Sequence, residues 1–244
     1  MMLLLDAGNT RLKWAIHDGA AIRDSGALDY GELDELRRTA AALAPASQVV
    51  GVNVAGQGSA DAIAAVLEPF GLVPEWNLSC RDQCGVRNSY EQAGQLGADR
   101  WAALIGARAL HRGPVVVVMA GTATTVDLLD ETGVFLGGLI FPGFDLMRGS
   151  LARNTAQLPY ADGCYTAQPR RTADAIFSGC LHAQAGAVER LFAQFAIHPA
   201  AKCLVGGGGA ELLLGALSVP REFQPHLVLH GLARIGLESR QSPG

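Results

Sequence analysis

A short polar turn near the start of the chain contains residue types suited to a phosphate group. Asp6, Gly8, Thr10 and Lys13 lie within eight residues, directly after three leucines. Glycine lets a backbone approach a phosphate closely, and lysine supplies a matching point charge. A carboxylate repels phosphate, so we expect Asp6 to act through a magnesium ion, which prefers carboxylate and phosphate oxygens. The competing interpretation is a plain hairpin turn that uses Gly and Asn for their backbone freedom.

A second turn of this kind stands in the middle of the chain. Gly121 and Thr122 follow the apolar run at 115–118, and a strand-like segment continues from Val126. Both regions therefore combine an apolar strand, Ala-Gly, a hydroxyl-bearing turn and another strand, which indicates a duplication with one hairpin per lobe. Strand-glycine-strand segments are also common in α/β proteins without duplication. Neither turn matches the P-loop or the dinucleotide-binding pattern, so those two classes are not expected.

Asp99 is the third candidate for chemistry, and it lies near the beginning of an expected helix at 97–110. An ordinary first-turn acid, stabilised by the helix N-terminus, is one interpretation. The functional interpretation is a base that accepts a hydroxyl proton during phosphoryl transfer. Arg100 beside it either binds a substrate carboxylate or is a solvated surface arginine.

Strands and helices alternate around these residues, which predicts an α/β protein. The glycine run at 206–209 either lets adenine or ribose lie against bare backbone or is a plain strand-to-helix turn. Apolar runs predict strands at 3–5, 12–16, 49–54, 115–118, 126–129, 134–140 and 203–205, and helical spacing predicts helices at about 31–43, 60–67, 97–110, 143–153, 174–196, from 210 and at 227–237.

The composition limits the classes of function. The 244 residues suffice for one large domain or two lobes, and 49% hydrophobic against 17% charged residues excludes general disorder. A net charge of −4 argues against a nucleic-acid partner. No apolar run approaches the ~18 residues of a membrane span, and no signal peptide is recognisable. None of the five cysteines forms a C-x-x-C pair. We therefore expect a cytoplasmic protein with no membrane partner.

Five motifs in order closely resemble those of type III pantothenate kinase, a family of the actin-like, sugar-kinase and heat-shock ATPase superfamily. The resemblance runs from residue 2 to about residue 236. It implies two duplicated actin-like (ribonuclease H-like) lobes with a central cleft, at 1–113 and 114–244. The motifs are Asp6-x-Gly8-Asn9-Thr10-x-x-Lys13, Asn88-x-Tyr90, Leu96-Gly97-x-Asp99-Arg100-Trp101, Gly121-Thr122-Ala123-x-Thr125-x-Asp127 and Gly137-Gly138-x-Ile140-x-Pro142-Gly143.

The resemblance also implies ATP-dependent phosphorylation of pantothenate to 4'-phosphopantothenate, the first step of coenzyme A biosynthesis, by a homodimer. Asp99 resembles the general base for the primary hydroxyl of pantothenate, and Asp6 the magnesium ligand. Thr172 matches a pantothenate contact, although it could simply N-cap the following helix. The implied ATP-binding residues are Asp6, Ala7, Gly8, Asn9, Thr10, Arg11, Leu12, Lys13, Gly121 and Thr122, and the implied pantothenate-binding residues are Tyr90, Gly97, Ala98, Asp99, Arg100 and Thr172.

One departure and two alternatives remain open. Met119 stands where the family usually has an aspartate that helps to hold a monovalent cation, K⁺ or NH₄⁺, so we expect weak or no dependence on potassium. A regulatory protein of the same fold without activity is one alternative, but Asp99 next to Arg100 favours an enzyme. Another kinase of the superfamily, such as a sugar kinase, is not expected to combine these two residues with Tyr90.

Overall fold

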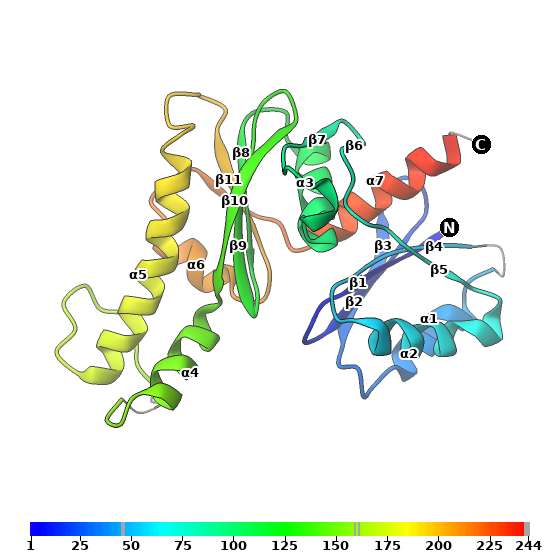
Figure 1. Cartoon of the computed structure of the whole chain (residues 1–244). Helices are drawn as coiled ribbons and strands as arrows, with labels where there is room; N and C mark the ends of the chain where they lie inside the picture. The colour runs from blue at the N-terminus through cyan, green and yellow to red at the C-terminus, as the bar shows by residue number, and fades with distance from the viewer. Residues whose placement is uncertain (45–46, 159, 161, 242–244) are drawn as a thin grey trace. The chain divides into compact units, whose positions relative to one another are not determined.

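The computed structural model describes residues 1–44, 47–158, 160 and 162–241, which form two compact units (Figure 1). Unit 1 consists of Met1–His111, Gly133–Phe135 and the chain from His226 onward. Unit 2 consists of Arg112–Thr132 and Leu136–Pro225. The two units are therefore interleaved in the sequence, and the expected division into domains 1–113 and 114–244 stays a prediction.

The sheet of unit 1 has the strand order β3-β2-β1-β4-β5. Its central strand β1 (Met2–Ala7) pairs antiparallel with β2 (Leu12–His17) and parallel with β4 (Gln48–Asn53). The edges are β3 (Ile22–Leu28) and β5 (Pro74–Trp76). Every residue of β1 is buried, as expected of a strand that is covered on both faces and reads as a continuous apolar run.

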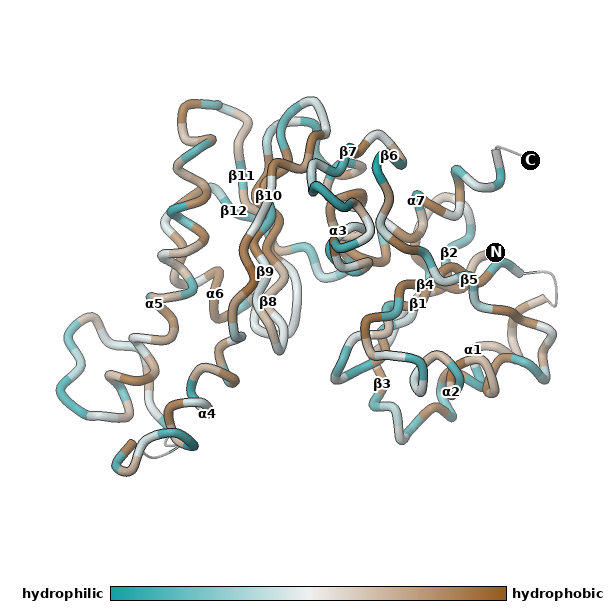
Figure 2. The backbone as a smooth tube through the Cα atoms, viewed as in Figure 1, coloured by the Kyte–Doolittle hydropathy of each residue, from teal (hydrophilic) through white to brown (hydrophobic). Residues whose placement is uncertain are grey.

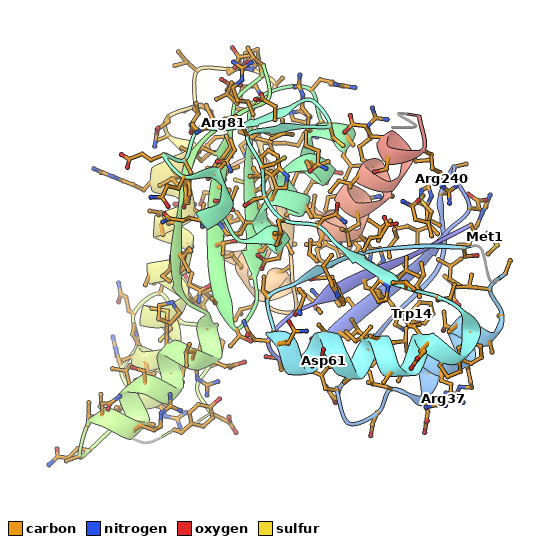
Figure 3. All side chains as sticks on the ribbon, turned by 45° about the vertical axis from the view of Figure 1, so that its right-hand side comes forward. Met1, Trp14, Arg37, Asp61, Arg81 and Arg240 are labelled. Carbon is orange, nitrogen blue, oxygen red and sulfur yellow. The ribbon has the colours of Figure 1, made fainter. Side chains whose placement is uncertain are left out.

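Helices cover both faces of this sheet. On one face, α1 (Asp34–Ala41) and α2 (Gln57–Leu67), followed by the 3₁₀ turn η1 (Glu68–Phe70), share a hydrophobic cluster with alternate residues of β1 and with Trp14 (Figure 3). On the other face, α7 (Leu227–Gln241) packs on β1 and β4 and against α3 (Ala98–Leu110). Unit 1 is thus a three-layer arrangement.

Unit 2 repeats the topology of unit 1. Its strands are ordered β10-β9-β8-β11-β12, which matches β3-β2-β1-β4-β5 position by position. The first hairpin is antiparallel and the last two strands are added in parallel in both cases. This correspondence supports the expected duplication. The elements are β8 (Val115–Ala120), β9 (Ala123–Leu129), β10 (Val134–Pro142), α4 (Phe144–Asn154), α5 (Thr172–Phe192), β11 (Lys202–Gly206), α6 (Ala210–Ala216) and β12 (Arg221–Phe223).

Short elements occupy the segment between β5 and α3. They are β6 (Asp82–Gln83), β7 (Val86–Asn88) and the 3₁₀ turn η2 (Ala93–Gln95). β7 pairs in parallel with Val134 and Phe135, the first residues of β10, which belong to unit 1. Hydrophobic residues concentrate along the inner strands of each sheet in Figure 2. Among the helices in the described ranges, none is long and apolar enough to cross a membrane.

Two glycines allow α3 and α7 to approach each other closely. A Cβ at Gly231 would collide with the carbonyl oxygen of Ala102, and one at Gly106 with that of Leu227. Both obstacles are backbone atoms, which cannot move aside as a flexible side chain can. The position of α3, and of the residues at its N-terminus, therefore depends on this contact.

We expect Gly231→Ala to lower the free energy of unfolding by about 2–3 kcal/mol, because overpacking against backbone forces the helices apart. Urea unfolding followed by circular dichroism measures the change. Gly186→Ala is the matched control, since it lies within α5 with open space around its Cβ position. That variant should gain about 0.5–1 kcal/mol from helix propensity. Equal stability of the two variants would contradict the close contact.

Candidate functional site

The β1–β2 hairpin places a carboxylate opposite an amine. Asp6 and Lys13 are cross-strand partners, and Lys13 Nζ lies 3.8 Å from Asp6 Oδ2. Ala7 and Leu12 form the last pair before the turn, and both are buried. The Gly8 N–H donates to the Arg11 carbonyl at 3.2 Å, which closes the turn. The apolar strand thus presents Asp6 at the base of a tight polar turn.

The environment of Asp6 opposes its ionisation. The residue is only 6% exposed, and burial raises the pKa of its carboxyl group to about 6. Lys13 lowers this pKa and the nearby Asp99 carboxylate raises it, both less than burial does. Asp6 and Asp99 therefore interact although 93 positions separate them in the sequence. A cation placed beside Asp6 would relieve both the burial and the repulsion.

The rest of the turn is held by side chains from β3 and the segment that follows it. The Tyr30 hydroxyl donates to the Gly8 carbonyl at 2.7 Å. Arg11 pairs with Asp29 at 3.2 Å and donates to the Ala27 carbonyl. Arg11 thus connects the turn to β3 and the residues that follow it, whereas Asn9 and Thr10 are exposed at the tip of the turn.

Asp99 lies in the first turn of α3, as the sequence predicted. Its Oδ1 accepts the backbone N–H of Arg100 at 2.8 Å, and a Cβ at Gly97 would lie 2.7 Å from the same oxygen. Gly97 is the N-cap residue and its lack of a side chain leaves space for the carboxylate. Ala98 is buried beneath this turn. Asp99 is half-buried, so it combines a fixed position with access to a ligand.

Arg100 lies in an aromatic cluster rather than at the surface. It is 4% exposed, so the interpretation of Arg100 as a solvated surface arginine is wrong. Its Nη1 donates to the Tyr90 hydroxyl at 3.2 Å, and its guanidinium carbon lies 5.9 Å from the ring centres of both Tyr90 and Phe135. The two rings are 5.3 Å apart. Since Tyr90 accepts from Arg100, its own hydroxyl proton remains available to a ligand.

The loop that carries Tyr90 is fixed by hydrogen bonds to its backbone. Buried Asn88 accepts the Tyr90 N–H at 3.0 Å and donates to the Ala93 carbonyl. Arg81 donates to the carbonyls of Asn88 and Tyr90, and Ser79 donates to that of Leu96 at 2.7 Å. Only Asn88 appeared in a motif. Arg81, Ser79 and Phe135 gave no signal in the sequence, because their partners are main-chain atoms or rings distant along the chain.

In unit 2, the β8–β9 hairpin is also closed by a hydrogen bond from a glycine N–H. The Gly121 N–H donates to the Ala123 carbonyl at 3.1 Å, as Gly8 does to Arg11. This turn contains two residues between the strands, against four in unit 1. Gly143 packs directly on it, because its N–H donates to the Thr122 carbonyl at 2.8 Å and a Cβ would collide with the Gly121 carbonyl.

The glycine run that follows β11 also packs against this hairpin. Gly207 has a φ of +96°, and a Cβ there would collide with the Ala120 carbonyl. The Gly209 N–H donates to that same carbonyl at 2.9 Å. A Cβ at Gly206 would lie 2.7 Å from the Gln224 carbonyl oxygen. Gly206 and Gly207 are thus required by close backbone approach, which the plain-turn interpretation explains without a nucleotide.

Thr172 is the first residue of α5 and is exposed. The N-cap residue is Arg171, so the interpretation of Thr172 as the N-cap is wrong. Asp174, two residues further, is buried and accepts the Cys164 N–H at 3.1 Å, which attaches the preceding segment to the helix.

The structure groups the predicted residues by unit. Unit 1 brings together Asp6, Lys13 and Asp99, and beside Asp99 the pair of Tyr90 and Arg100. Unit 2 contains Gly121, Thr122 and Thr172. Unit 1 thus combines a buried acid that favours a cation (Asp6), an amine (Lys13) and an accessible carboxylate (Asp99) beside a buried guanidinium. These groups can support the transfer of a phosphoryl group to an alcohol.

Comparison with known proteins leads to the same chemistry. A family model described as Type III pantothenate kinase matches residues 2–194. The type III pantothenate kinase of Aromatoleum aromaticum is 54% identical over 238 residues and covers 98% of each chain. That of an Azoarcus species is 52% identical over 237 residues, covering 96% of this chain and 90% of its own.

A solved structure shows the fold independently of close sequence similarity. The activator of the 2-hydroxyisocaproyl-CoA dehydratase from Clostridium difficile, solved with bound ADPNP, matches with a TM-score of 0.56 at 13% identity. The match covers 100% of this chain and 98% of that one. The expected α/β class and actin-like ATPase fold are confirmed. By its motifs and by relatives that span nearly its whole length, the chain belongs to the type III pantothenate kinase family.

Proposed function

We propose that Asp99, Asp6 and Lys13 carry the transfer of a phosphoryl group from ATP to pantothenate, the reaction of this family. The chain is a pantothenate kinase of coenzyme A biosynthesis by its family membership. The roles of the individual residues are the proposal. The observation that carries them is the proximity of Asp99 to Asp6 within unit 1, which brings a free carboxylate close to a phosphate-binding turn.

Asp99 acts as the general base in this proposal. It accepts the proton of the pantothenate primary hydroxyl as that oxygen attacks the γ-phosphorus, and the bond to the β-phosphate oxygen breaks. Its Oδ1 is fixed by the Arg100 N–H, which leaves Oδ2 for the substrate. Arg100 and Tyr90 bind polar groups of pantothenate, with the guanidinium suited to its carboxylate and the tyrosine hydroxyl donating to an oxygen.

Magnesium fits the surroundings of Asp6. The carboxyl group is buried, its pKa is raised to about 6, and a second carboxylate adds repulsion, so a divalent cation would stabilise the ionised form. Mg²⁺ binds through one or two carboxylates together with water and phosphate oxygens. When bound, it supplies charge neutralisation at the phosphates. No group of three metal-ligating side chains is found among the described residues.

Both glycine turns bind the phosphates of ATP in this proposal. Residues Asp6 to Lys13 and the pair Gly121–Thr122 offer backbone N–H groups and hydroxyls, and Lys13 adds a positive charge. Gly8 and Gly121 each follow the buried first strand of an antiparallel hairpin and donate across its turn, which supports equivalent roles. The nucleotide role of Arg11 is limited to support of the turn, because its guanidinium is engaged with Asp29 and Ala27.

The side chain of Met119 is a poor ligand for a monovalent cation. This residue pairs with Thr125 across the β8–β9 ladder and its sulfur lies beside Gly206. Thioether sulfur is a soft ligand, whereas K⁺ takes oxygen ligands. The Thr125 hydroxyl is buried without a hydrogen-bond partner among the described residues, and one such oxygen does not make a site. We therefore propose that turnover depends weakly or not at all on K⁺ or NH₄⁺.

A homodimer is also part of the proposal. Three aliphatic side chains of β10 are exposed, namely Leu136, Leu139 and Ile140, and Leu146 of α4 is exposed as well. A second copy of the chain would cover this apolar surface. Analytical ultracentrifugation of the purified chain measures the oligomeric state directly, and a monomer at micromolar concentration would oppose it. The expected cytoplasmic location stays a prediction.

We expect Asp99→Asn to lower kcat by about 10²–10⁴-fold, because the amide cannot accept the hydroxyl proton. The melting temperature should not change, since the amide oxygen still accepts the Arg100 N–H. A coupled ADP-release assay with pantothenate and a panel of sugars and hydroxy acids measures rate and specificity. Asp61→Asn, an exposed carboxylate of α2, is the control. Turnover of Asp99→Asn at the wild-type rate would show that Asp99 is not the base.

We expect Asp6→Asn to abolish turnover and yet to stabilise the fold at neutral pH. A raised folded-state pKa means that ionisation of Asp6 costs stability, and this cost grows as the pH rises from about 4 to about 6 and is constant above that. Replacing the ionisable carboxyl group should therefore add about 3 kcal/mol to the free energy of unfolding at pH 8, which corresponds to the pKa shift from 3.8 to about 6. The gain should shrink as the pH falls toward 4. Chemical denaturation between pH 4 and 8 without Mg²⁺ and ATP measures it, and a gain that is the same at pH 4 as at pH 8 would contradict the assigned cause.

We expect replacement of KCl by tetramethylammonium chloride at equal ionic strength to leave turnover within about twofold. The physical reason is the sulfur at position 119, which is a poor ligand for an alkali cation. Met119→Asp is the matched variant, since it introduces the carboxylate typical of the family. A many-fold activation of the unaltered chain by K⁺ would refute the assignment.

A further inference from the structure

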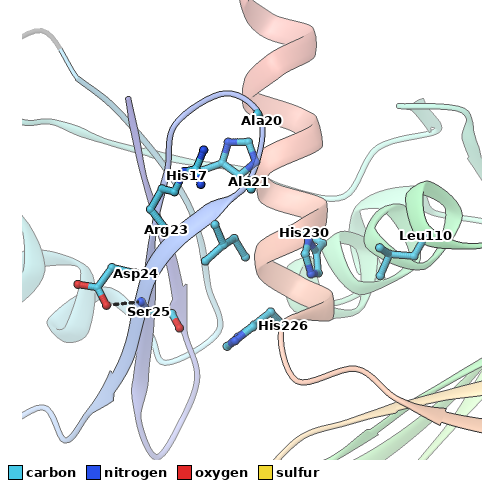
Figure 4. A pocket seen from close by; sticks show the side chains of 10 residues that line it. His17, Ala20, Ala21, Arg23, Asp24, Ser25, Leu110, His226 and His230 are labelled. Carbon is cyan, nitrogen blue, oxygen red and sulfur yellow. Dashed lines mark hydrogen bonds between the residues drawn. The ribbon is translucent and has the colours of Figure 1, made fainter.

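A pocket in unit 1 has a lining that the kinase reaction does not use. It has a volume of about 680 Å³ and lies between the β2–β3 hairpin, the end of α3 and the beginning of α7 (Figure 4). None of the proposed phosphate- or pantothenate-binding residues lines it. Three of its lining residues are histidines, namely His17, His226 and His230, out of six in the whole chain.

His226 and His230 are one helical turn apart and present two imidazole rings to the pocket. Their ring centres are 6.5 Å apart, and both side chains are half-buried. Neither ring has a hydrogen-bond partner within the part of the chain that the structure describes. Partly buried polar groups without protein partners are suited to a ligand.

His17 contributes a fixed hydrogen-bond donor. It is 6% exposed, and its Nδ1 accepts the Gly19 N–H at 3.0 Å. That bond requires an unprotonated Nδ1, so the proton of the neutral ring is on Nε2. His17 therefore donates without a change of charge, and His226 and His230 are the two rings that can take up a proton.

The beginning of α7 adds positive electrostatic potential. The His226 carbonyl accepts the His230 N–H at 2.8 Å, so the helix starts directly after His226. The first N–H groups of this 15-residue helix therefore lie at the pocket, where the helix dipole favours an anion. Lys13 lies close enough to lower the pKa of His226.

Of the remaining charged groups around the pocket, Arg23 pairs with Asp18 at 2.5 Å. Asp24 accepts the Ser25 N–H, a neutral donor, so its carboxylate is the one lining group that opposes an anion. Asp18 raises the pKa of His17 and Arg240 of α7 lowers it, both less than burial does. Burial is the largest cause of the lowered pKa of all three histidines, so the rings are neutral in the free protein at neutral pH.

We propose that this pocket binds a small organic anion, a carboxylate or a phosphate ester with an apolar portion, which His17, His226 and His230 contact. The apolar portion would pack on Ile22 and Leu110, and the charged group would lie at the rings and the beginning of α7. An anion stabilises the imidazolium form, so binding is accompanied by proton uptake at His226 and His230.

Because binding of the anion takes up protons, its affinity depends on pH in a definite direction. The affinity for the anion rises as the pH falls, by up to about tenfold per pH unit for each proton taken up. A transition-metal ion would show the opposite dependence, because it binds the neutral rings and competes with protons.

The test is histidine-detected NMR of the full chain with the kinase site filled by pantothenate and a non-hydrolysable ATP analogue. Benzoate and phenyl phosphate serve as probes, and uncharged benzamide is the matched control. We expect saturable shifts of the His17, His226 and His230 resonances with at least one anion, a raised pKa of His226 and His230, and tighter binding at pH 6 than at pH 8. The resonances of His182 and His198 in unit 2 should not move.

Variants separate the site from general surface binding. His226→Gln and His230→Gln should each weaken binding of the anion about tenfold at pH 6, whereas His198→Gln should leave it unchanged. The proposal is overturned if neither anion shifts these resonances, if benzamide binds as well as benzoate does, or if binding tightens with rising pH. Saturable, proton-releasing binding of Zn²⁺ at His226 and His230 without binding of either anion would likewise replace it with a metal site.

Discussion

The burial of one carboxylate governs the arrangement of unit 1. Asp6 is the penultimate residue of a strand that is buried along its whole length, and its partner Lys13 is 3.8 Å away. An acid in this position is costly to ionise unless a cation accompanies it. The antiparallel register supplies the lysine, and the Tyr30 hydroxyl holds the turn above it. The core that makes β1 stable is therefore the same feature that prepares Asp6 for a metal ion and a phosphate.

The strands predicted most accurately from the sequence are those with the simplest physical requirement. The apolar runs at 3–5 and 115–118 are covered by helices or strands on all sides, so burial alone dictates their composition. β3 and β12 lie at sheet edges and are largely exposed, and their polar sequences carry no strand pattern. β7 forms because it pairs with the first residues of β10, and no local pattern reports so distant a partner.

The candidate site was predictable in its residue types but not in its environment. Asp6 and Lys13 were found because they lie within eight residues of glycine and threonine, and Asp99 because it lies beside Arg100 at the start of an expected helix. The burial of Arg100 could not be predicted, because it depends on the ring of Phe135, which is apolar and distant in the sequence. Ser79 and Arg81 bind main-chain carbonyls, and such contacts impose no recognisable spacing on the sequence.

The membership of α7 in unit 1 has a consequence for biosynthesis on the ribosome. The α3 surface around Ala102 and one face of β1 and β4 receive their cover from a helix that is translated only after all of unit 2. Until α7 emerges, that apolar surface is exposed in the nascent chain, and such surfaces recruit chaperones or aggregate. All strands and helices of unit 2 are translated before α7. Unit 1 is therefore begun first and completed last.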